Sequence, residues 1–248
     1  MVNATLNVAR SMAGPVETRS QFPHPAQTDS PATETMNAPL IWLSALALYG
    51  LFSLWYNNWH GPLRPDEIDY YMDQLVSSAN ETPDSERLSV IRKFLETDDA
   101  TEFFMVNLIR LRPGKLDVAG LDAPTSAGKV LEKYTGYFLP ALLRRAGHPA
   151  FYGRAAGGYV ESWGVEANPG WSLAGVVRYR SRRDMIVLAT NPAFEPAHVF
   201  KVAALEKTFA FPATPGLVIV GPRIWVALVL SLVAALLHLL LVTSGASA

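Results

Sequence analysis

Two long apolar runs without acidic or basic charge frame the chain, one at residues 40–56 and one at residues 224–242. At about 1.5 Å of rise per helical residue, each run crosses most or all of a roughly 30 Å hydrocarbon layer. The pattern predicts transmembrane helices at residues 39–59 and 223–243. The segment between them is then tethered to one face of a membrane at both ends.

Aromatic residues mark both ends of the first run, with Trp42 at one end and Trp55, Tyr56 and Trp59 at the other. Such aromatic belts are typical of the two water interfaces of a bilayer. A core helix of a soluble protein is the alternative, and it is disfavoured by the length of the uncharged run.

In the second run Ala227, Ser231 and Ala235 recur every four residues. This spacing places small side chains on one stripe, where another helix can approach closely. His238 lies on the same stripe near the end of the run. An ionisable group in a span is a functional candidate, but here we favour interfacial water or a Ser or Tyr hydroxyl of the partner helix as its hydrogen-bond partner.

Residues 1–38 are rich in Ala, Thr, Ser and Pro and have no sustained apolar period, which predicts a disordered tail; residues 244–248 form a second, short tail. The basic residues of the tail lie far from the apolar run, so we expect an uncleaved anchor rather than a secretory signal. Met1 and Met36 are both candidate start sites. Arg64 and Arg223 flank the central segment, so the positive-inside rule predicts a multi-pass inner-membrane protein with a cytoplasmic central domain.

An acidic connector at residues 64–99 follows the first run. Between residues 65 and 99 it has ten acidic and three basic residues, whereas residues 100–223 have fifteen basic and nine acidic ones. The two parts are therefore predicted to dock electrostatically, with solvated charges as the alternative. Apolar spacing predicts two short helices, the second starting at Thr82-Pro83-Asp84; their apolar faces carry Ile68, Met72, Leu75 and Leu88, Ile91, Leu95.

Residues 100–215 alternate between strand and helix patterns. The run 103–111 is apolar on both faces, which predicts a strand covered on both sides. The further predicted elements, in order, are a helix at 126–145, an extended run at 150–163, a strand at 171–179, helices at 182–190 and 195–206, and a strand at 208–211. The order β-α-β-β-α-β predicts an α+β, ferredoxin-like domain.

Several short motifs resemble an uncharacterised domain family of the dimeric α/β-barrel superfamily. They are Met105-Val106-Asn107-Leu108, Tyr134 with Tyr137, Arg145-Ala146-Gly147, Tyr179-Arg180-Ser181, and Asn191-Pro192-Ala193-Phe194 leading to His198. The resemblance covers roughly residues 103–212. It implies a homodimer whose two sheets pair into a barrel. Relatives in the superfamily include cofactor-free monooxygenases, muconolactone isomerases and haem-handling enzymes, so the resemblance implies no particular reaction.

The chain departs from the family pattern in its last helix. Phe194 stands where the family often has Tyr, and Val199 follows His198 where a basic residue is usual. These departures weaken a catalytic interpretation of His198, which is a candidate general base or haem ligand but lacks a recognisable orienting carboxylate. His148 follows Gly147 at a predicted helix end, where we expect it to complement the helix dipole.

Seven side chains form the candidate ligand set: Asn107, Tyr134, Arg154, Glu161, Trp171, Tyr179 and His198. Asn107 is the polar member of an apolar strand face, so it lines a pocket or bonds to neighbouring backbone. The strand residues, with Trp163, would form an aromatic-walled cavity for a small organic anion or enol-forming substrate. The alternative is that the aromatic side chains Trp171 and Tyr179 only fill the core of the domain. The basic cluster Arg178, Arg180, Arg182 and Arg183 fits either anionic lipid headgroups or a solvated strand end.

The composition narrows the function classes further. The chain has no Cys, which excludes disulfides and thiolate chemistry, and its net charge of −1 gives no field for nucleic acid. No metal-binding, Walker or dinucleotide motif occurs, so we predict no cofactor. The sequence favours a membrane-tethered, homodimeric, small-molecule-binding domain. The alternatives are a non-catalytic membrane scaffold and a cofactor-free monooxygenase or isomerase acting on a lipophilic substrate.

Overall fold

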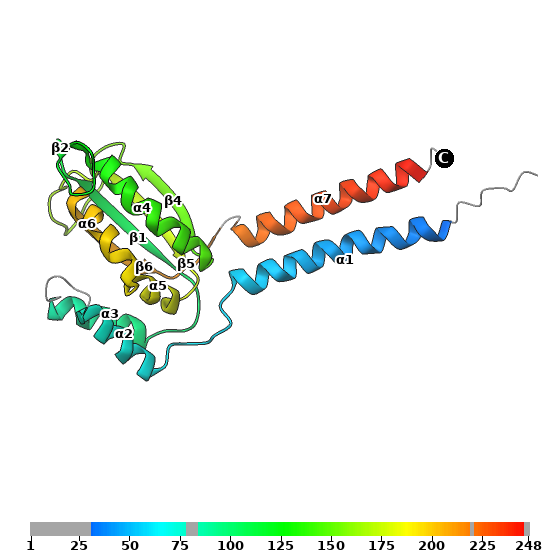
Figure 1. Ribbon diagram of the computed structural model, residues 1–248, viewed down its shortest axis with the longest axis horizontal. Coiled ribbons are helices and arrows are strands. Elements are labelled where there is room, and N and C mark those ends of the chain that lie inside the picture. Colours follow the sequence, from blue (N-terminus) through cyan, green and yellow to red (C-terminus); the bar gives the residue numbers. More distant parts are fainter. Residues whose placement is uncertain (1–30, 78–83, 219–220, 246–248) are drawn as a thin grey trace, which may run out of the picture.

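The computed structural model describes residues 31–77, 84–218 and 221–245. Two long helices extend side by side from one end of a mixed α/β domain (Figure 1). They are α1, Pro31–Tyr56, and α7, Pro222–Gly245, and their segments Asn37–Tyr56 and Pro222–Ser244 are long and apolar enough to span a membrane. Helix α1 begins at Pro31, so the predicted tail is wrong for residues 31–38; residues 1–30 and 246–248 lie outside the described residues.

The two long helices run antiparallel and contact each other along their length (Figure 1). Ala234 of α7 is buried, whereas Ser231 and Ala235 are exposed. Ser231 and Ala235 therefore face away from α1, whereas Ala227 is half-buried. His238 does find a partner on α1, but the partner is an indole rather than a hydroxyl: Trp42 Nε1 donates to His238 Nδ1 at 3.2 Å.

Both predicted connector helices are present, as α2 at Pro65–Ser77 and α3 at Ser85–Glu96. Ile68, Met72 and Leu95 bury their side chains together with Ile186 of the α/β domain. The Asp84 side chain accepts the backbone N–H of Glu86 at 3.2 Å and caps α3. Residues 82 and 83 of the predicted helix start lie outside the described residues.

The domain is built on a four-stranded antiparallel sheet in the order β4-β5-β1-β6. Strand β1, Phe103–Leu111, forms where a strand was predicted, and it lies in the middle of the sheet. The other strands are β4 at His148–Arg154, β5 at Leu173–Tyr179 and β6 at Leu205–Ala213. A separate two-stranded ribbon, β2 at Lys115–Leu116 and β3 at Thr125–Ser126, was not predicted.

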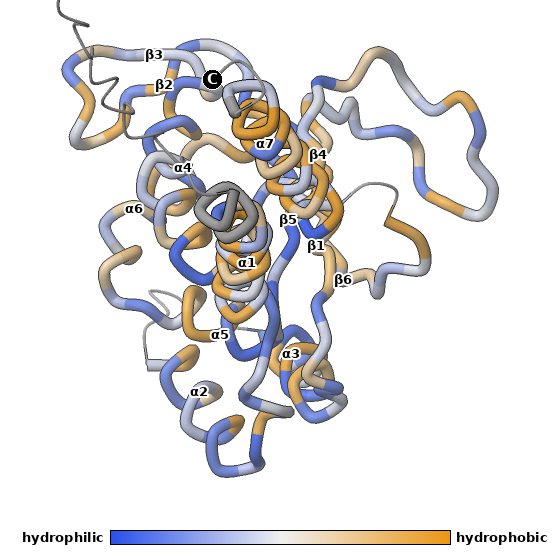
Figure 2. Tube along the Cα trace, turned by 90° about the vertical axis from the view of Figure 1, so that its right-hand side faces the viewer, coloured by the Kyte–Doolittle hydropathy of each residue, from blue (hydrophilic) through white to orange (hydrophobic). Residues whose placement is uncertain are grey.

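Helices α4 at Ala127–Arg144, α5 at Arg182–Ala189 and α6 at Glu195–Ala204 lie on one face of this sheet (Figures 1 and 2). A 3₁₀ turn, η1 at Pro192–Phe194, joins α5 to α6. Phe103, Met105 and Ile109 of β1 point to the helices, where they pack with Leu142 and Val130 of α4 and with neighbouring core residues. Alternate residues of β1 therefore point to opposite faces of the sheet, and the helices cover one of these faces.

The predicted extended run at 150–163 is wrong beyond Arg154. Strand β4 ends there, and residues 155–172 form a long connection to β5. Glu161, Trp163 and Trp171 consequently lie in this connection and not on strands. The Gly and Pro residues of the segment favour this outcome, because both interrupt strand pairing.

Candidate functional site

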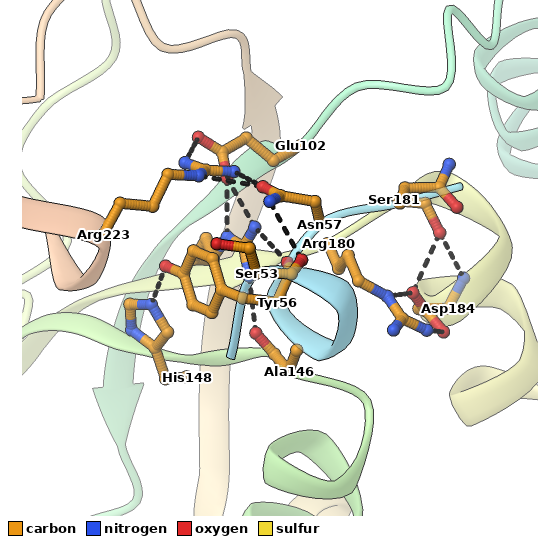
Figure 3. A network of polar contacts seen from close by, with 12 residues as sticks. Ser53, Tyr56, Asn57, Glu102, Ala146, His148, Arg180, Ser181, Asp184 and Arg223 are labelled. Atoms are coloured by element: carbon orange, nitrogen blue, oxygen red, sulfur yellow. Dashed lines mark hydrogen bonds and ion pairs between the residues drawn. The ribbon is translucent and has the colours of Figure 1, made fainter. Parts of the chain in front are cut away.

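A polar network joins the two long helices to the sheet (Figure 3). Its centre is Arg178 of β5, whose side chain is only 1% exposed. Arg178 Nε and Nη2 donate to Glu102 Oε2 at 2.8 and 2.5 Å. Nη1 donates to the carbonyl of Ala146 at 2.5 Å, and Nη2 to the carbonyl of Tyr56 at 3.1 Å. One guanidinium thus binds the sheet, the turn after α4 and the end of α1.

A second guanidinium reaches the same carboxylate from α7. Arg223 Nη1 donates to Glu102 Oε1 at 3.0 Å, and Arg223 Nη2 to Glu102 Oε2 at 3.0 Å. Arg223 Nε and Nη2 also donate to Asn57 Oδ1 at 2.9 and 2.7 Å. Glu102 is therefore the counter-ion of two arginines from different parts of the chain. This shared carboxylate ties both long helices to the domain.

The aromatic ring of Tyr56 packs against both guanidinium groups. Arg178 Cζ lies 3.8 Å from the ring centroid and Arg223 Cζ lies 4.9 Å from it. The Tyr56 hydroxyl is 2.8 Å from His148 Nε2, and the two rings stack with centroids 5.9 Å apart. His148 is thus the first residue of β4 and a partner of Tyr56. The predicted role as a helix cap is wrong, because α4 ends at Arg144 and a turn intervenes.

Burial and the neighbouring charges have opposite effects on the pKa values of Glu102 and Arg178. Burial alone would raise the pKa of the Glu102 carboxyl, but the hydrogen bond from Arg223 and the charge of Arg178 outweigh it, so this pKa is lowered. Burial lowers the pKa of the Arg178 guanidinium, and Glu102 opposes that change. Breaking such a buried pair leaves an uncompensated charge. The charged forms of Glu102 and Arg178 therefore stabilise each other.

The turn after α4 is shaped to bring the Ala146 carbonyl to Arg178. Ala146 has a φ of 55°, in the left-handed region, and the Gly147 N–H closes the helix on the Leu142 carbonyl at 3.0 Å. A Cβ on Gly147 would lie 2.4 Å from Leu142 Cδ1 and 3.0 Å from the Arg178 carbonyl oxygen. Only glycine fits this close approach. The Arg145-Ala146-Gly147 motif thus has a structural role here.

The remaining basic cluster also binds the chain itself. Arg180, Arg182 and Arg183 each donate to main-chain carbonyls far away in sequence. Their acceptors are Trp55 for Arg180, Phe94 for Arg182, and Gly61 and Pro62 for Arg183. These side chains are mostly buried. Both sequence interpretations of the cluster, lipid headgroup contact and a solvated strand end, are therefore wrong: it anchors α1 and the connector.

Ion pairs complete this attachment. Arg183 pairs with Glu67 of α2 at 2.9 Å, and Arg182 lies 3.7 Å from Asp98. These pairs join the acidic connector to the basic part of the chain, as the charge pattern predicted. Every fully buried side-chain nitrogen or oxygen in residues 31–77, 84–218 and 221–245 has a hydrogen-bond partner. The buried polar groups of the junction are thus all hydrogen-bonded.

The predicted ligand set does not converge on one cavity. Asn107 points to the helix side and donates to the Met105 carbonyl at 2.9 Å, which is the backbone-bonding alternative. Arg154 is exposed at the end of β4 and Glu161 is exposed in the connection. Trp171 Nε1 donates to the Tyr159 hydroxyl at 3.0 Å. These four side chains are fixed locally or face solvent.

Tyr134 of α4 and Tyr179 of β5 are near enough to interact electrostatically. The Tyr179 ring stacks on Phe103 at 5.2 Å, and the Tyr134 ring stacks on Phe138 at 5.6 Å. Burial raises the pKa of Tyr134 to about 12. Burial, with a smaller effect of Tyr134, raises the pKa of Tyr179 further still. Both phenols are therefore neutral core groups at ordinary pH.

Lys201 of α6 is a polar neighbour that the sequence analysis missed. Its Nζ lies 5.5 Å from the centroid of the Tyr134 ring. Burial, and to a smaller extent Arg87, lowers its pKa. His198 is exposed on the same helix, and partial burial together with Lys201 and Arg87 lowers its pKa. The helical spacing of Lys201 from the buried residues Ala197 and Ala204 could have indicated that its side chain faces the core.

Two open grooves lie elsewhere on the described part of the chain. One, of about 400 Å³, lies between the outer ends of α1 and α7 and is lined by Leu40, Ile41, Leu237 and neighbouring residues. The other, of about 420 Å³, lies near the start of α4 and is lined by Leu121, Thr125, Lys129 and neighbouring residues. Neither groove is lined by any of the seven predicted ligand residues.

The sheet face opposite the helices is apolar. Phe104, Val106 and Leu108 of β1 alternate with the helix-facing residues and belong to no described core cluster. Register places further apolar residues beside them, namely Ala174, Val176, Phe209 and Phe211, with Phe151 next to Val176. Phe209 is 53% exposed. The end of this face nearest α1 carries Arg178 and His148, so the face continues into the junction.

Comparisons with known proteins give little further information. The chain matches no protein-family model and none of the curated proteins. Among solved structures it is similar to the crystal structure of the methylated RPA0582 protein, with 20% identity over 56% of this chain and 94% of that chain and a TM-score of 0.43. A second structure, a protein of unknown function from Rhodopseudomonas palustris, has 20% identity over 54% of this chain and 94% of its own, with a TM-score of 0.42.

Proposed function

We propose that the chain is an integral membrane protein whose tethered domain pairs with a second copy through the uncovered sheet face and binds a small organic molecule between the two sheets. The observation that carries the proposal is the apolar face formed by Phe104, Val106, Leu108, Phe209 and their neighbours. A contiguous, partly exposed apolar surface of this kind is typical of an interaction site.

A ferredoxin-like topology and a dimeric α/β barrel are part of this proposal. The element order β1-α4-β4-β5-α5/α6-β6 and the strand order β4-β5-β1-β6 support the topology. Helices on one face and an apolar opposite face support closure of the barrel by a second sheet. We place the domain in the cytoplasm, because the basic residues Arg64 and Arg223 lie beside the two spans and such residues favour the cytoplasmic side.

The same membrane carries both copies in the same orientation. A two-fold axis relating them therefore runs along the membrane normal. Rotation about such an axis brings two like sheet faces together while both pairs of spans stay in one bilayer. The charged groups Glu102, Arg178 and Arg223 then lie at the membrane end of the space between the sheets, and the apolar strand residues line its middle.

Native mass spectrometry of the full chain, released from detergent, tests the proposal. We expect two chains that carry additional mass removed by organic extraction. The full chain is required, because Arg178 binds the end of α1 and the domain without its helices would lose that contact. Two chains without additional mass would overturn ligand binding, and single chains at all concentrations would overturn the pairing.

A non-catalytic scaffold is a second candidate, and one observation favours it. Ser231 and Ala235 of α7 are exposed on the side away from α1. Small side chains on that side leave room for a helix of another chain. Under this function the dimer forms and carries no ligand, so the mass measurement distinguishes the two candidates.

A further inference from the structure

The connection between β4 and β5 is held in a defined shape at its base. We call residues 155–172 the β4–β5 arm. The Ala155 N–H donates to the Ser172 carbonyl at 3.0 Å, and Trp171 Nε1 binds the Tyr159 hydroxyl at 3.0 Å. Arg110 Nη1 of β1 donates to the Pro169 carbonyl at 2.5 Å. These bonds tie the two legs of the arm to each other and to the sheet.

The tip of the arm carries large apolar side chains in solvent. Val160 is 103% exposed, Trp163 is 79% exposed and Val165 is 64% exposed. A side chain of Trp size is costly to leave in water and is over-represented where proteins make their strongest contacts. One tryptophan and two valines exposed within six positions, on a fixed base, favour a surface that is covered by a partner.

The arm points to the side of the uncovered sheet face. Figure 2 shows it extending from the sheet on the side opposite α4 and α6. Strand β4 begins at His148, beside Tyr56 at the end of α1, and runs for seven residues before the arm starts. At about 3.3 Å per residue the base of the arm is roughly 20 Å from the junction. The arm is thus directed to the space in front of the sheet, away from the bilayer.

We propose that the β4–β5 arm docks on a second copy of this chain, with Trp163 as its anchor. This inference rests on the proposed pairing of sheet faces. A two-fold axis along the membrane normal places the β4 edge of one copy beside the β6 edge of its partner. Each arm then lies against the partner's β6 edge, and the two arms hold the dimer from opposite sides.

The β6 edge has the chemistry to receive the arm. Phe209 and Phe211 are exposed on β6, and Leu217 is exposed in the segment that follows it. Lys207 of β6 is exposed, and its neighbour Glu206 is neutralised by Arg110 at 3.0 Å. The arm carries the acidic residues Glu161 and Glu166. The two surfaces are therefore apolar at their centres and complementary in charge.

Site-specific photo-crosslinking in the full, membrane-inserted chain tests this docking. A benzophenone amino acid is placed at Trp163, with a second probe at Phe209 on the sheet face. Tyr137, which is 58% exposed on α4, is the control on the helix-covered side. We expect the Trp163 probe to give a two-chain product whose crosslink maps to residues 205–218, and the Tyr137 probe to give none.

The outcomes separate this inference from the proposed function. Two-chain products from Phe209 but not from Trp163 would overturn the docking arm and leave the sheet pairing intact. Products from neither position would overturn both. Adducts of Trp163 with lipid, or with another protein alone, would also overturn the docking.

Substitution of the anchor provides a second readout. Trp163→Ser should weaken the dimer by about tenfold or more, as expected for loss of a buried interface tryptophan. Tyr137→Ser is the matched control and should leave the dimer unchanged. Because Trp163 is exposed in the single chain, its replacement does not remove a core contact, and an unchanged dimer would overturn the inference.

Discussion

The guanidinium of Arg178 lies 3.8 Å from the ring centroid of Tyr56, although the two residues are 122 positions apart. The contact places the last residue of the first long helix on the end of the sheet from which the two long helices extend. Glu102, which immediately precedes β1, neutralises both Arg178 of β5 and Arg223 of α7 at the same point. The two long helices and the α/β domain are thus one connected unit, and their attachment can be tested residue by residue.

Replacing Glu102 tests whether the junction stabilises the chain. Glu102→Gln leaves the buried Arg178 without its counter-ion, and we expect a loss of about 3 kcal/mol in the free energy of unfolding. Thermal unfolding of the detergent-solubilised chain measures it. Asp66→Asn, which removes the same charge from an exposed ion pair with Arg64, should leave the melting temperature unchanged. Equal behaviour of the two variants would contradict the role of Glu102.

The stability of the junction should depend on acid pH. The pKa of Glu102 is lowered from its usual value of 4.5, because the arginine contacts outweigh the effect of burial. The stabilisation by this carboxylate is therefore complete above pH 4.5 and is lost as the pH falls through the lower, folded-state pKa. Melting temperatures between about pH 7 and pH 3 should show the wild type and Glu102→Gln converging in acid. A constant difference over this range would count against the assignment.

Two substitutions of Tyr56 separate its hydroxyl from its ring. Tyr56→Phe removes only the hydrogen bond with His148, so we expect a loss of about 1 kcal/mol. Tyr56→Ala also removes the ring that packs against both guanidinium groups, so it should cost clearly more. Chemical denaturation of both variants gives the comparison. The account fails on this point if the two variants are equally stable.

The orientation of the spans is open to a direct test. With Arg64 and Arg223 on the cytoplasmic side, a reporter fused after Ala248 should be outside the cytoplasm. Alkaline phosphatase fused there is expected to be active, and a fluorescent protein that folds only in the cytoplasm is expected to be dark. The opposite pair of signals would place the domain on the other side.

Local patterns in the sequence predicted most of the secondary structure. The apolar run at 103–111 predicted β1 correctly. The spacing of Ile68 and Met72 predicted the buried face of α2, and Asp84 caps α3. These features depend on near neighbours, so periodicity and capping chemistry reveal them. Part of the connection at 155–172 was predicted as strand, because its aromatic residues are typical of strands. The local sequence does not reveal that β4 ends at Arg154 and that the segment after it leaves the sheet.

The role of the arginine cluster could not be predicted, because its partners are distant main-chain carbonyls. No local pattern states that Arg178 binds the Tyr56 carbonyl or that Arg183 binds the Gly61 carbonyl. For the same reason the seven candidate ligand residues were predicted to line one cavity, whereas the structure brings only Tyr134 and Tyr179 near each other. Charge balance did predict that the acidic connector docks on the basic part of the chain, since that property is a sum over many residues.

The most direct test of the central claim, that the uncovered sheet face joins two copies, is the dimer fraction of the full chain in lipid bilayers after substitution of Phe209. Phe209 and Tyr137 are similarly exposed aromatic residues on opposite sides of the domain, at 53% and 58%. Subunit counting by single-molecule photobleaching should show dimers for the wild type and for Tyr137→Arg, and single chains for Phe209→Arg. Dimers that persist in Phe209→Arg, or a wild type that is monomeric, would contradict the account.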